Sequence, residues 1–393
     1  MPFLNANNTR LFYRVEGRSG LPALVLSHSL GCDHAMWEPQ MAELLEYFQV
    51  VRYDTRGHGA SAVPAGDYTI EQLGRDLLSL ADALEIKTFA FCGLSMGGAV
   101  GQWLALNAPE RLTSVILANT AARFATPEVW ETRRISVREG GMAAIADTTM
   151  QRFFSANMLE SGDPYAQSVR SVFLGTDPAG YISCCAALRD VDFQAHLGRI
   201  RTPTLVIGSD NDPSTPWPDA GSVLAGEIPG AKAAVLSGAH LSNLAQPRTF
   251  TSSMLEFLLA GDLARDPLEL GRRIRTEVLG REHVDRSMNT ATELTRDFQL
   301  LMTRSSWGAV WSRPGLNRGT RRLIVLVITA AMGRWEEFRL HLRAALQHGM
   351  EQCEIREALL QTAIYAGAPA ANTGFHIASE EIEKQRTKQG ESA

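Results

Sequence analysis

One serine lies in a sequence that can expose it as a nucleophile. Residues 93–97 read Gly-Leu-Ser-Met-Gly, between an apolar strand-like run at 89–92 and a helix-like run that ends near 107. A serine between a strand and a helix must adopt a strained backbone to present its hydroxyl, and the flanking glycines leave room for the tight turn. The amino end of the helix favours developing negative charge. We therefore expect Ser95 to be a catalytic nucleophile.

A nucleophilic serine needs a histidine base and an acid that orients it. With a serine on this kind of turn, the chain order is serine, acid, histidine. His240 follows the strand-like run at 233–236, where the base belongs. The acid should follow the run at 204–208, and residues 208–213, Gly-Ser-Asp-Asn-Asp-Pro, offer two aspartates. Asp212 is favoured because it precedes Pro-Ser-Thr-Pro, and Asp210 stays open as the alternative.

The negative charge that forms on an attacked carbonyl oxygen needs two backbone N–H donors. One is expected from Met96, directly after the nucleophile, and the other from Leu30 in the loop that follows the strand-like run at 23–27. His28, in that loop, is expected to brace it by hydrogen bonds. The polar residues at 54–61 are expected to hold neighbouring loops in place.

These residues are positioned by alternating strand-like and helix-like runs. Apolar strands are predicted at 11–16, 23–27, 50–54, 89–92, 115–117, 204–208 and 233–236, with helices at 70–84 and 97–107. Apolar strands separated by helices predict an α/β fold with a parallel sheet covered on both faces. Residues 122–198 have helical periodicity without a strand, which predicts a helical lid over the active site.

A second, all-α domain is predicted after the first. The first domain is expected to span residues 1–262 and the second 268–393, joined by a linker at 261–267. Helices of the second domain are expected at 268–279, 290–305, 318–332, 335–347, 354–366 and 370–383.

Composition narrows the possible partners. The net charge is −5, from 38 Lys and Arg against 43 Asp and Glu, without a basic block, which argues against a nucleic acid or an anionic membrane surface as partner. The five cysteines form no C-x-x-C, which argues against a disulfide framework or a zinc site. No signal peptide is visible, and the most apolar run, 323–332, is shorter than the roughly 20 residues of a membrane span. We expect a cytoplasmic protein without metal or cofactor.

Several motifs of residues 1–260 resemble one enzyme family. They are His-Ser-Leu-Gly-Cys-Asp-His-Ala-Met-Trp at 28–37, Asp-Thr-Arg-Gly-His-Gly at 54–59, Gly-Leu-Ser-Met-Gly-Gly at 93–98 and Asp-Pro-Ser-Thr-Pro at 212–216. This region resembles the α/β-hydrolase superfamily, and 3-oxoadipate enol-lactonases in particular. One departure is the extra residue before the usual acid position, which keeps Asp210 open.

Motifs of residues 268–393 resemble 4-carboxymuconolactone decarboxylases. They include Glu-His-Val-Asp-Arg at 282–286, Trp-Gly-Ala-Val-Trp at 307–311 and Gln-Thr-Ala-Ile-Tyr-Ala-Gly-Ala-Pro at 361–369. Wider relatives use C-x-x-C-x-x-x-H for peroxide chemistry, but here Arg334 and Glu337 stand at the cysteine positions before His341. Cys353 is out of register, and we expect it to be buried. The resemblance also implies rings, so we expect a homo-oligomer through this domain.

Decarboxylation would leave electron density in a lactone carbonyl, which cationic or hydrogen-bonding groups should stabilise before an acid protonates carbon. Glu337 and His341 lie one helical turn apart and are the candidates for proton transfer, although they could be a solvated pair. Arg321 or Arg322 could hold substrate carboxylates, and His376 is a second candidate acid.

Together the two resemblances imply a bifunctional enzyme of protocatechuate breakdown that acts on small anionic lactones. Trp130, Arg133 and Arg134 of the lid are candidates for binding the lactone, or for lid packing. Two alternatives stay open at this point: a hydrolase of another ester or lactone with a non-catalytic helical oligomerisation domain, and a receptor that keeps the triad residues but barely turns over.

Overall fold

The computed structural model describes residues 2–260, 266–313 and 315–390. The chain divides into two compact units, Met1–Leu258 and Leu259–Ala393. Most of the linker predicted at 261–267, namely 261–265, lies outside the described residues.

The first unit is built on one eight-stranded sheet with the strand order β1-β2-β4-β3-β5-β6-β7-β8. β1 and β2 are antiparallel to their neighbours, and the pairs from β4 to β8 are parallel. The central strands β3, β5 and β7 are almost wholly buried, as expected for a parallel sheet covered on both faces. The strands are β1 Phe3–Ala6, β2 Thr9–Glu16, β3 Ala23–Ser27, β4 Gln49–Tyr53, β5 Phe89–Leu94, β6 Leu112–Ala118, β7 Thr204–Ser209 and β8 Lys232–Leu236.

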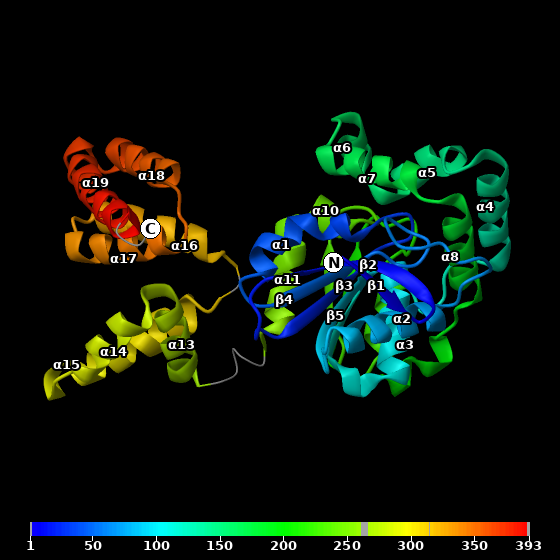
Figure 1. Ribbon diagram of the computed structural model, residues 1–393, viewed down its shortest axis with the longest axis horizontal. Coiled ribbons are helices and arrows are strands. Elements are labelled where there is room, and N and C mark those ends of the chain that lie inside the picture. Colours follow the sequence, from blue (N-terminus) through cyan, green and yellow to red (C-terminus); the bar gives the residue numbers. More distant parts are fainter. Residues whose placement is uncertain (1, 261–265, 314, 391–393) are drawn as a thin grey trace. The chain divides into compact units, whose positions relative to one another are not determined.

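Helices cover both faces of this sheet. The amphipathic α2, Ile70–Ala83, begins at a capping box between Thr69 and Gln72 and buries its apolar stripe beside α3, Met96–Asn107. On the other face, α1, Glu38–Leu44, packs against α11, Pro247–Leu258 (Figure 1). The remaining helices outside the lid are η1 His34–Trp37, η2 Pro109–Arg111, α9 Gly221–Glu227 and α10 Ser242–Ala245.

The segment between β6 and β7 is helical, as its periodicity predicts (Figure 1). Proline follows the N-cap of α4, α7 and α8, and aspartates cap α7 and α8. An isolated bridge between Arg123 and Asp192 closes the base of the insertion. Its helices are α4 Pro127–Gly140, α5 Ala143–Phe153, α6 Ala156–Glu160, α7 Pro164–Gly175, α8 Pro178–Asp190 and η3 Gln194–Arg199.

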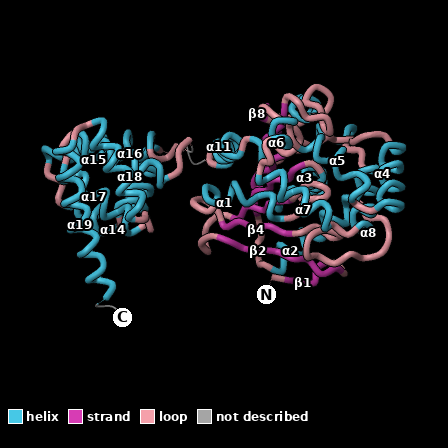
Figure 2. The backbone as a smooth tube through the Cα atoms, turned by 90° about the horizontal axis from the view of Figure 1, so that it is seen from above, coloured by secondary structure: helices cyan, strands magenta, loops and turns pink. Residues whose placement is uncertain are grey.

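The described residues of the second unit form only helices, turns and loops (Figure 2). The α/β-then-all-α fold class is therefore confirmed. The helices are α13 Pro267–Leu279, α14 Arg281–Asn289, α15 Glu293–Met302, η4 Thr303–Val310, α16 Arg318–Ala331, α17 Trp335–Gln347, α18 Gln352–Tyr365 and α19 Ala368–Gly390. The sequence did not predict α14, and η4 is a π-helix where an α-helix was expected to end.

Two apolar clusters form the core of the second unit. One joins α16, α17, α18 and α19 around Phe338 and Leu342. The other joins α13, α14 and η4 around Val278 and Trp307, and reaches α17 through Ala344. Gly271 allows α13 and η4 to meet, because a Cβ there would lie 2.0 Å from the Thr303 carbonyl oxygen.

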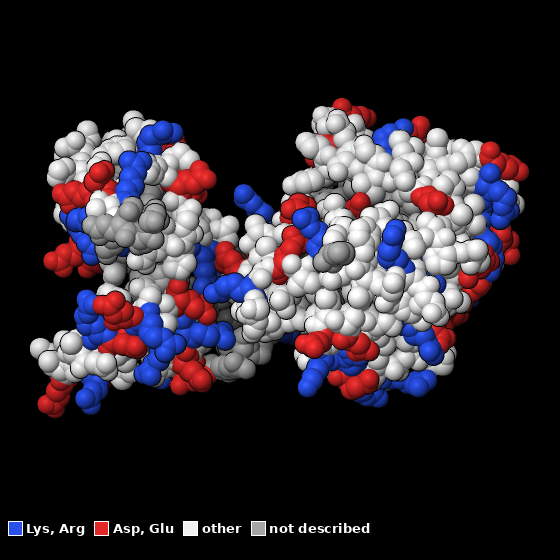
Figure 3. Space-filling model, viewed as in Figure 1, with Lys and Arg blue, Asp and Glu red and all other residues white. Residues whose placement is uncertain are grey.

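Basic and acidic side chains are intermixed on the visible face of each unit (Figure 3). None of the described helices is long and apolar enough to cross a membrane.

Candidate active sites

Ser95 occupies a strained turn between β5 and α3. Its φ of 58° and ψ of −111° lie in a region that non-glycine residues rarely adopt. The neighbouring glycines are required by close backbone approach: a Cβ on Gly93 would lie 2.0 Å from the Gly97 carbonyl oxygen, and one on Gly97 would lie 2.3 Å from that of Ser27. The strain presents Ser95 at the start of a buried helix, as the G-x-S-x-G pattern predicts.

His240 and Asp212 form a buried pair. His240 Nδ1 lies 2.8 Å from Asp212 Oδ2, and both side chains are almost fully excluded from solvent. Asp212 also accepts hydrogen bonds from Asn119 Nδ2 at 3.0 Å and Thr215 Oγ1 at 2.7 Å. Burial raises the pKa of Asp212, but His240 and these hydrogen bonds outweigh it and hold the pKa well below its ordinary value. The carboxylate therefore stays ionised and orients the imidazole.

Asp210, the alternative acid, is a turn residue. It is exposed, and its Oδ1 accepts hydrogen bonds from the Gly238 N–H at 2.9 Å and from Asn211 Nδ2 at 3.0 Å. These bonds tie the loop after β7 to the loop that carries His240. The imidazole itself pairs with Asp212.

Ser95 and His240 line one cavity of about 170 Å³ between the sheet and the lid. Phe153 of α5 stacks on the His240 ring, with centroids 5.6 Å apart. The cavity also includes Leu30 and Trp130, two residues singled out from the sequence. Its walls are Ser29, Leu30, Ser95, Phe124, Ala125, Val129, Trp130, Arg133, Arg152, Phe153, Tyr181, Leu188, Pro213, Ser214, Thr215 and His240.

Two lid arginines line this cavity. Arg133 donates to Tyr181 Oη at 2.6 Å and to Thr149 Oγ1 at 2.7 Å, with no carboxylate partner among the described residues. Arg152 makes no hydrogen bond through its side chain within the described chain, and burial and the charge of Arg133 lower its pKa. Arg152 was not among the residues predicted from the sequence. Its carbonyl oxygen accepts a hydrogen bond from the His240 N–H at 3.3 Å, which joins the end of α5 to the loop of His240.

Arg134, by contrast, does not line the cavity. Its guanidinium is largely buried and pairs with Asp67 Oδ1 at 2.5 Å and Glu131 Oε1 at 2.7 Å. The expectation that it binds substrate is replaced by a packing role, because successive helical residues point in different directions and α4 presents Arg133 to the cavity instead.

The loop of Leu30 is held by two buried histidines. His58 Nε2 accepts from the Gly31 N–H, and His28 Nε2 accepts from the Thr55 N–H, each at 2.9 Å. Burial lowers the pKa of both, to about 3 for His58, which keeps these nitrogens unprotonated as acceptors. This matches the expected bracing. Met96, the other expected donor, is the first residue of α3.

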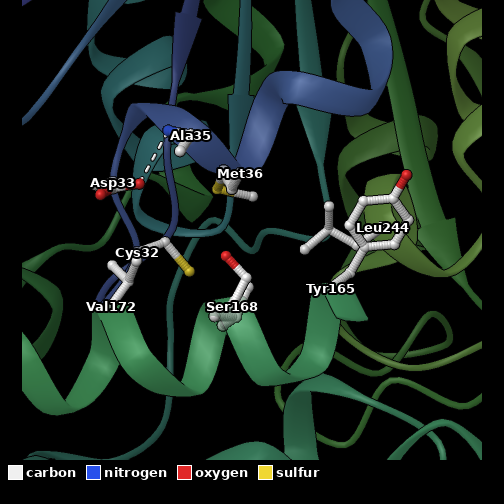
Figure 4. A pocket seen from close by; sticks show the side chains of 9 residues that line it. Cys32, Asp33, Ala35, Met36, Tyr165, Ser168, Val172 and Leu244 are labelled. Carbon is white, nitrogen blue, oxygen red and sulfur yellow. Dashed lines mark hydrogen bonds between the residues drawn. The ribbon is translucent and has the colours of Figure 1, made fainter. Parts of the chain in front are cut away.

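A second cavity, of about 30 Å³, lies between α7 and the loop after β3 (Figure 4). Cys32 and Met36 face Ser168 and Val172 of α7 across it. Burial raises the pKa of the Cys32 thiol far above its ordinary value, so this cysteine acts as a small apolar side chain.

In the second unit, His341 of α17 lies in an aromatic and cationic environment. Its ring is stacked near Trp307 and Trp311, with both centroid distances 6.2 Å. Its Nδ1 is buried without a hydrogen-bond partner among the described residues. Burial, His283 and Arg322 lower its pKa to about 4, while Glu337 opposes the shift. The charges of Arg322 and Glu337 therefore both act on His341.

Two other candidates lie elsewhere. Arg321 donates to the carbonyl oxygens of Leu316 and Arg313, and so braces the loop before α16. The His376 side chain is 77% exposed and pairs with Glu380 at 3.2 Å. The expectation that Cys353 is buried is wrong: it is exposed at the start of α18, with its Sγ 3.3 Å from Glu351 Oε2.

Comparison with known proteins assigns the first unit to a protein family. A family model described as the alpha/beta hydrolase fold matches residues 22–247, more than half of the chain. The chain belongs to the α/β-hydrolase family. It is 41% identical to the 3-oxoadipate enol-lactonase 2 of Acinetobacter baylyi over 251 residues, 64% of this chain and 94% of the relative. The enol-lactonase structure from Burkholderia xenovorans superposes with a TM-score of 0.64 at 43% identity, covering 65% of this chain and 99% of that one.

The second unit has its own relatives. A model of the carboxymuconolactone decarboxylase family matches residues 296–380. The chain is 46% identical to the 4-carboxymuconolactone decarboxylase of Acinetobacter baylyi over 110 residues, 28% of this chain and 82% of the relative. The α/β-hydrolase unit is therefore fused to a unit of this second family.

Proposed function

We propose that this chain is a bifunctional enzyme that decarboxylates 4-carboxymuconolactone and hydrolyses the resulting 3-oxoadipate enol-lactone to 3-oxoadipate, two reactions of protocatechuate breakdown. One observation carries the proposal: relatives of an enol-lactonase and of a 4-carboxymuconolactone decarboxylase lie on one chain. The decarboxylase relative's reaction yields the enol-lactone that the enol-lactonase relative hydrolyses. Fusion of the two units on one chain raises the local concentration of the enol-lactone for the hydrolase.

In the hydrolysis, Ser95 Oγ attacks the lactone carbonyl carbon while His240 takes its proton. The bond to the ring oxygen breaks, and that oxygen leaves as an enol protonated by His240, with the acyl group on Ser95. Water, deprotonated by His240, then releases the acid and restores Ser95. Asp212 stays ionised and stabilises the imidazolium in both steps. This assignment is supported by the short Asp212–His240 contact and by the shared cavity of Ser95 and His240.

The backbone N–H groups of Leu30 and Met96 stabilise the negative charge on the attacked oxygen by hydrogen bonds. Leu30 lines the cavity, and Met96 begins α3, whose amino end adds a favourable dipole. The buried His28 and His58 support this role, because they fix the loop that carries Leu30.

The enol-lactone keeps one free carboxylate, and the lid supplies cations for it. Arg133 and Arg152 both line the cavity, and Arg152 has no protein carboxylate beside it in the described chain. Trp130 closes the same wall and excludes water. We assign the carboxylate to the two arginines, because a guanidinium in a partly buried cavity binds carboxylate by charge-assisted hydrogen bonds.

In the decarboxylation, the C–C bond to the departing carboxylate breaks and CO₂ leaves. The bonding electron pair moves through the ring toward the lactone carbonyl oxygen, and a proton then adds to a ring carbon. Arg322 stabilises the charge on that oxygen, and the Glu337–His341 pair delivers the proton. The electrostatic coupling of His341 to Arg322 and Glu337 supports this grouping.

We also propose that the chain forms a homo-oligomer through its second unit. Leu294, Phe298 and Leu301 share one face of α15 and are 90%, 58% and 58% exposed. Apolar patches of this kind mark association surfaces. Light scattering after size-exclusion chromatography should give a multiple of 43.0 kDa for the wild type, and monomer for Leu294→Glu/Phe298→Glu.

A cytoplasmic location belongs to the same proposal. The adjacent Cys184 and Cys185 are buried as free thiols, and none of the five cysteines is paired. Free thiols in this number fit a reducing compartment.

The proposal is tested by ultraviolet monitoring of 4-carboxymuconolactone with the wild type and with Ser95→Ala. The wild type should form 3-oxoadipate. Ser95→Ala should consume the substrate at the same rate and accumulate the enol-lactone. A wild type that leaves 4-carboxymuconolactone untouched, while hydrolysing other lactones, would instead make the second unit a non-catalytic assembly module.

A further inference from the structure

Arg275 of α13 is a buried cation without an acidic partner. Arg275 is 7% exposed, and its Nε is buried without a hydrogen-bond partner among the described residues. One guanidinium nitrogen, Nη1, donates to Thr303 Oγ1 at 3.1 Å, and no carboxylate of the described chain lies within ion-pair distance. Burial lowers the pKa of Arg275. A charge in this position is costly, so its presence calls for a binding partner that the chain does not supply.

The charge of Arg275 acts on a neighbouring histidine of the second unit. Arg275 lowers the pKa of His283 on α14, and His283 in turn lowers the pKa of His341 on α17. Arg322 of α16 is the second cation that lowers the pKa of His341. The residues therefore form a chain of neighbours that runs from Arg275 to the imidazole of His341.

The π-helix η4 builds one wall of this cluster. Thr303, its first residue, holds Arg275, and Trp307, one turn further on, packs beside His341. π-helical turns are rare and recur at functional sites. Gln299, just before η4, has a buried Oε1 without a partner within the described residues, which adds a second unsatisfied polar group to this end of the unit.

We propose that Arg275 is a substrate-binding residue of the decarboxylase site and holds the carboxylate that the lactone retains through the reaction. The inference rests on the proposed function, since the retained carboxylate is that of 4-carboxymuconolactone. Hydrolysis of the enol-lactone gives a dicarboxylic acid, and the lactone carbonyl accounts for only one of its two carboxylates. The other is present before and after CO₂ is lost.

The choice of the retained carboxylate follows from charge. The departing carboxylate becomes neutral CO₂, so a guanidinium bound to it would stabilise the substrate more than the transition state and would slow the reaction. A guanidinium on the retained carboxylate binds both states equally. It lowers KM and positions the ring against His341, leaving Arg322 for the oxygen that gains charge.

The test compares Arg275→Met with Arg272→Gln, a neighbouring exposed arginine on the same helix. Arg275→Met should raise the KM for 4-carboxymuconolactone by about 10–100-fold with a smaller change in kcat, because uniform binding is lost. Arg275→Met should keep the wild-type rate of enol-lactone hydrolysis and the wild-type unfolding temperature. Arg272→Gln should keep the wild-type KM and kcat for 4-carboxymuconolactone. A purely structural Arg275 predicts a lower unfolding temperature and an unchanged KM, and that result would overturn the proposal.

Equilibrium binding separates this proposal from the proposed function. Isothermal titration with glutarate, an unreactive dicarboxylate, should show a component in the wild type that Arg275→Met loses and Arg272→Gln keeps. If the wild type binds glutarate in this way but does not decarboxylate, the anion site stands and the assigned reaction fails. If the isotherms of wild type and Arg275→Met coincide, Arg275 holds no carboxylate.

Discussion

At the scale of single residues, the hydrolase site depends on which aspartate faces the imidazole. Two aspartates, two positions apart on one loop, are indistinguishable by spacing. The backbone decides between them: the Asp210 N–H donates to Leu236, continuing the sheet, and its side chain caps the Gly238 turn. Asp212 lies beyond this point and faces His240. Motif and position along the chain predicted the serine and the histidine and favoured Asp212, but the choice between the two aspartates depends on the loop conformation.

Replacing each aspartate tests this assignment. Asp212→Asn should lower kcat for lactone hydrolysis by roughly 10³–10⁴-fold, because a neutral amide neither fixes the imidazole tautomer nor stabilises the imidazolium. Asp210→Asn should stay within a few-fold of the wild type, since its carboxylate only ties two loops. Stopped-flow decay of the enol-lactone measures both. Equal losses in the two variants would contradict the assignment.

His341 should make stability depend on pH. Its folded pKa, about 4, lies below the ordinary value of 6.5, so the unfolded chain binds the proton more readily. The stability that this histidine contributes is therefore complete above pH 6.5 and is lost as pH falls toward 4. A shift of that size corresponds to about 3 kcal/mol.

His341→Gln should remove that dependence in the second unit, measured by urea unfolding between pH 7 and pH 4. The exposed His376→Gln is the matched control and should keep the wild-type slope. A slope that His341→Gln leaves unchanged would assign the pH dependence to other groups.

At the scale of elements, the strands were largely predictable, and several helices were not. The predicted run at 23–27 coincides with β3, because three consecutive residues, Leu24 to Leu26, are apolar and buried. The helix α14 was missed because its nine residues include only one fully buried apolar side chain, Val284. The π-helix was missed because Trp307 and Trp311, four apart, also fit an α-helix. Propensity cannot reveal a wider turn that tertiary packing imposes.

The lid helices make a separate prediction about substrate binding. Arg152→Gln should raise the KM for the enol-lactone by roughly tenfold or more, since a charge-assisted hydrogen bond contributes about 1.5–3 kcal/mol. Arg170→Gln is the control, because Arg170 lies on the same lid but pairs with Asp147 outside the cavity. Steady-state kinetics on the enol-lactone and on an uncharged lactone give the comparison. An equal loss on both lactones would mean that Arg152 supports the lid and does not bind the carboxylate.

At the scale of the whole molecule, the chain is two compact units with separate cores and separate candidate sites. Composition narrowed the classes of partner and argued against a disulfide framework or a zinc site, but it indicated no reaction. The two functions emerged only from local motifs, because each chemistry depends on a few residues within a single unit. The described parts of the chain contain no group that both sites share, so either site should work when the other is inactivated.

Complementation between two inactivated chains tests this independence. Ser95→Ala lacks the hydrolase nucleophile, and His341→Ala lacks the proposed proton donor of the decarboxylase. An equimolar mixture should convert 4-carboxymuconolactone to 3-oxoadipate, since the enol-lactone can diffuse from one chain to the other. The wild type at the same concentration of active sites should show a shorter lag, because tethering raises the local concentration of the intermediate. Equal lags would mean that the fusion gives no kinetic advantage, and a mixture without product would mean that the sites depend on each other within one chain.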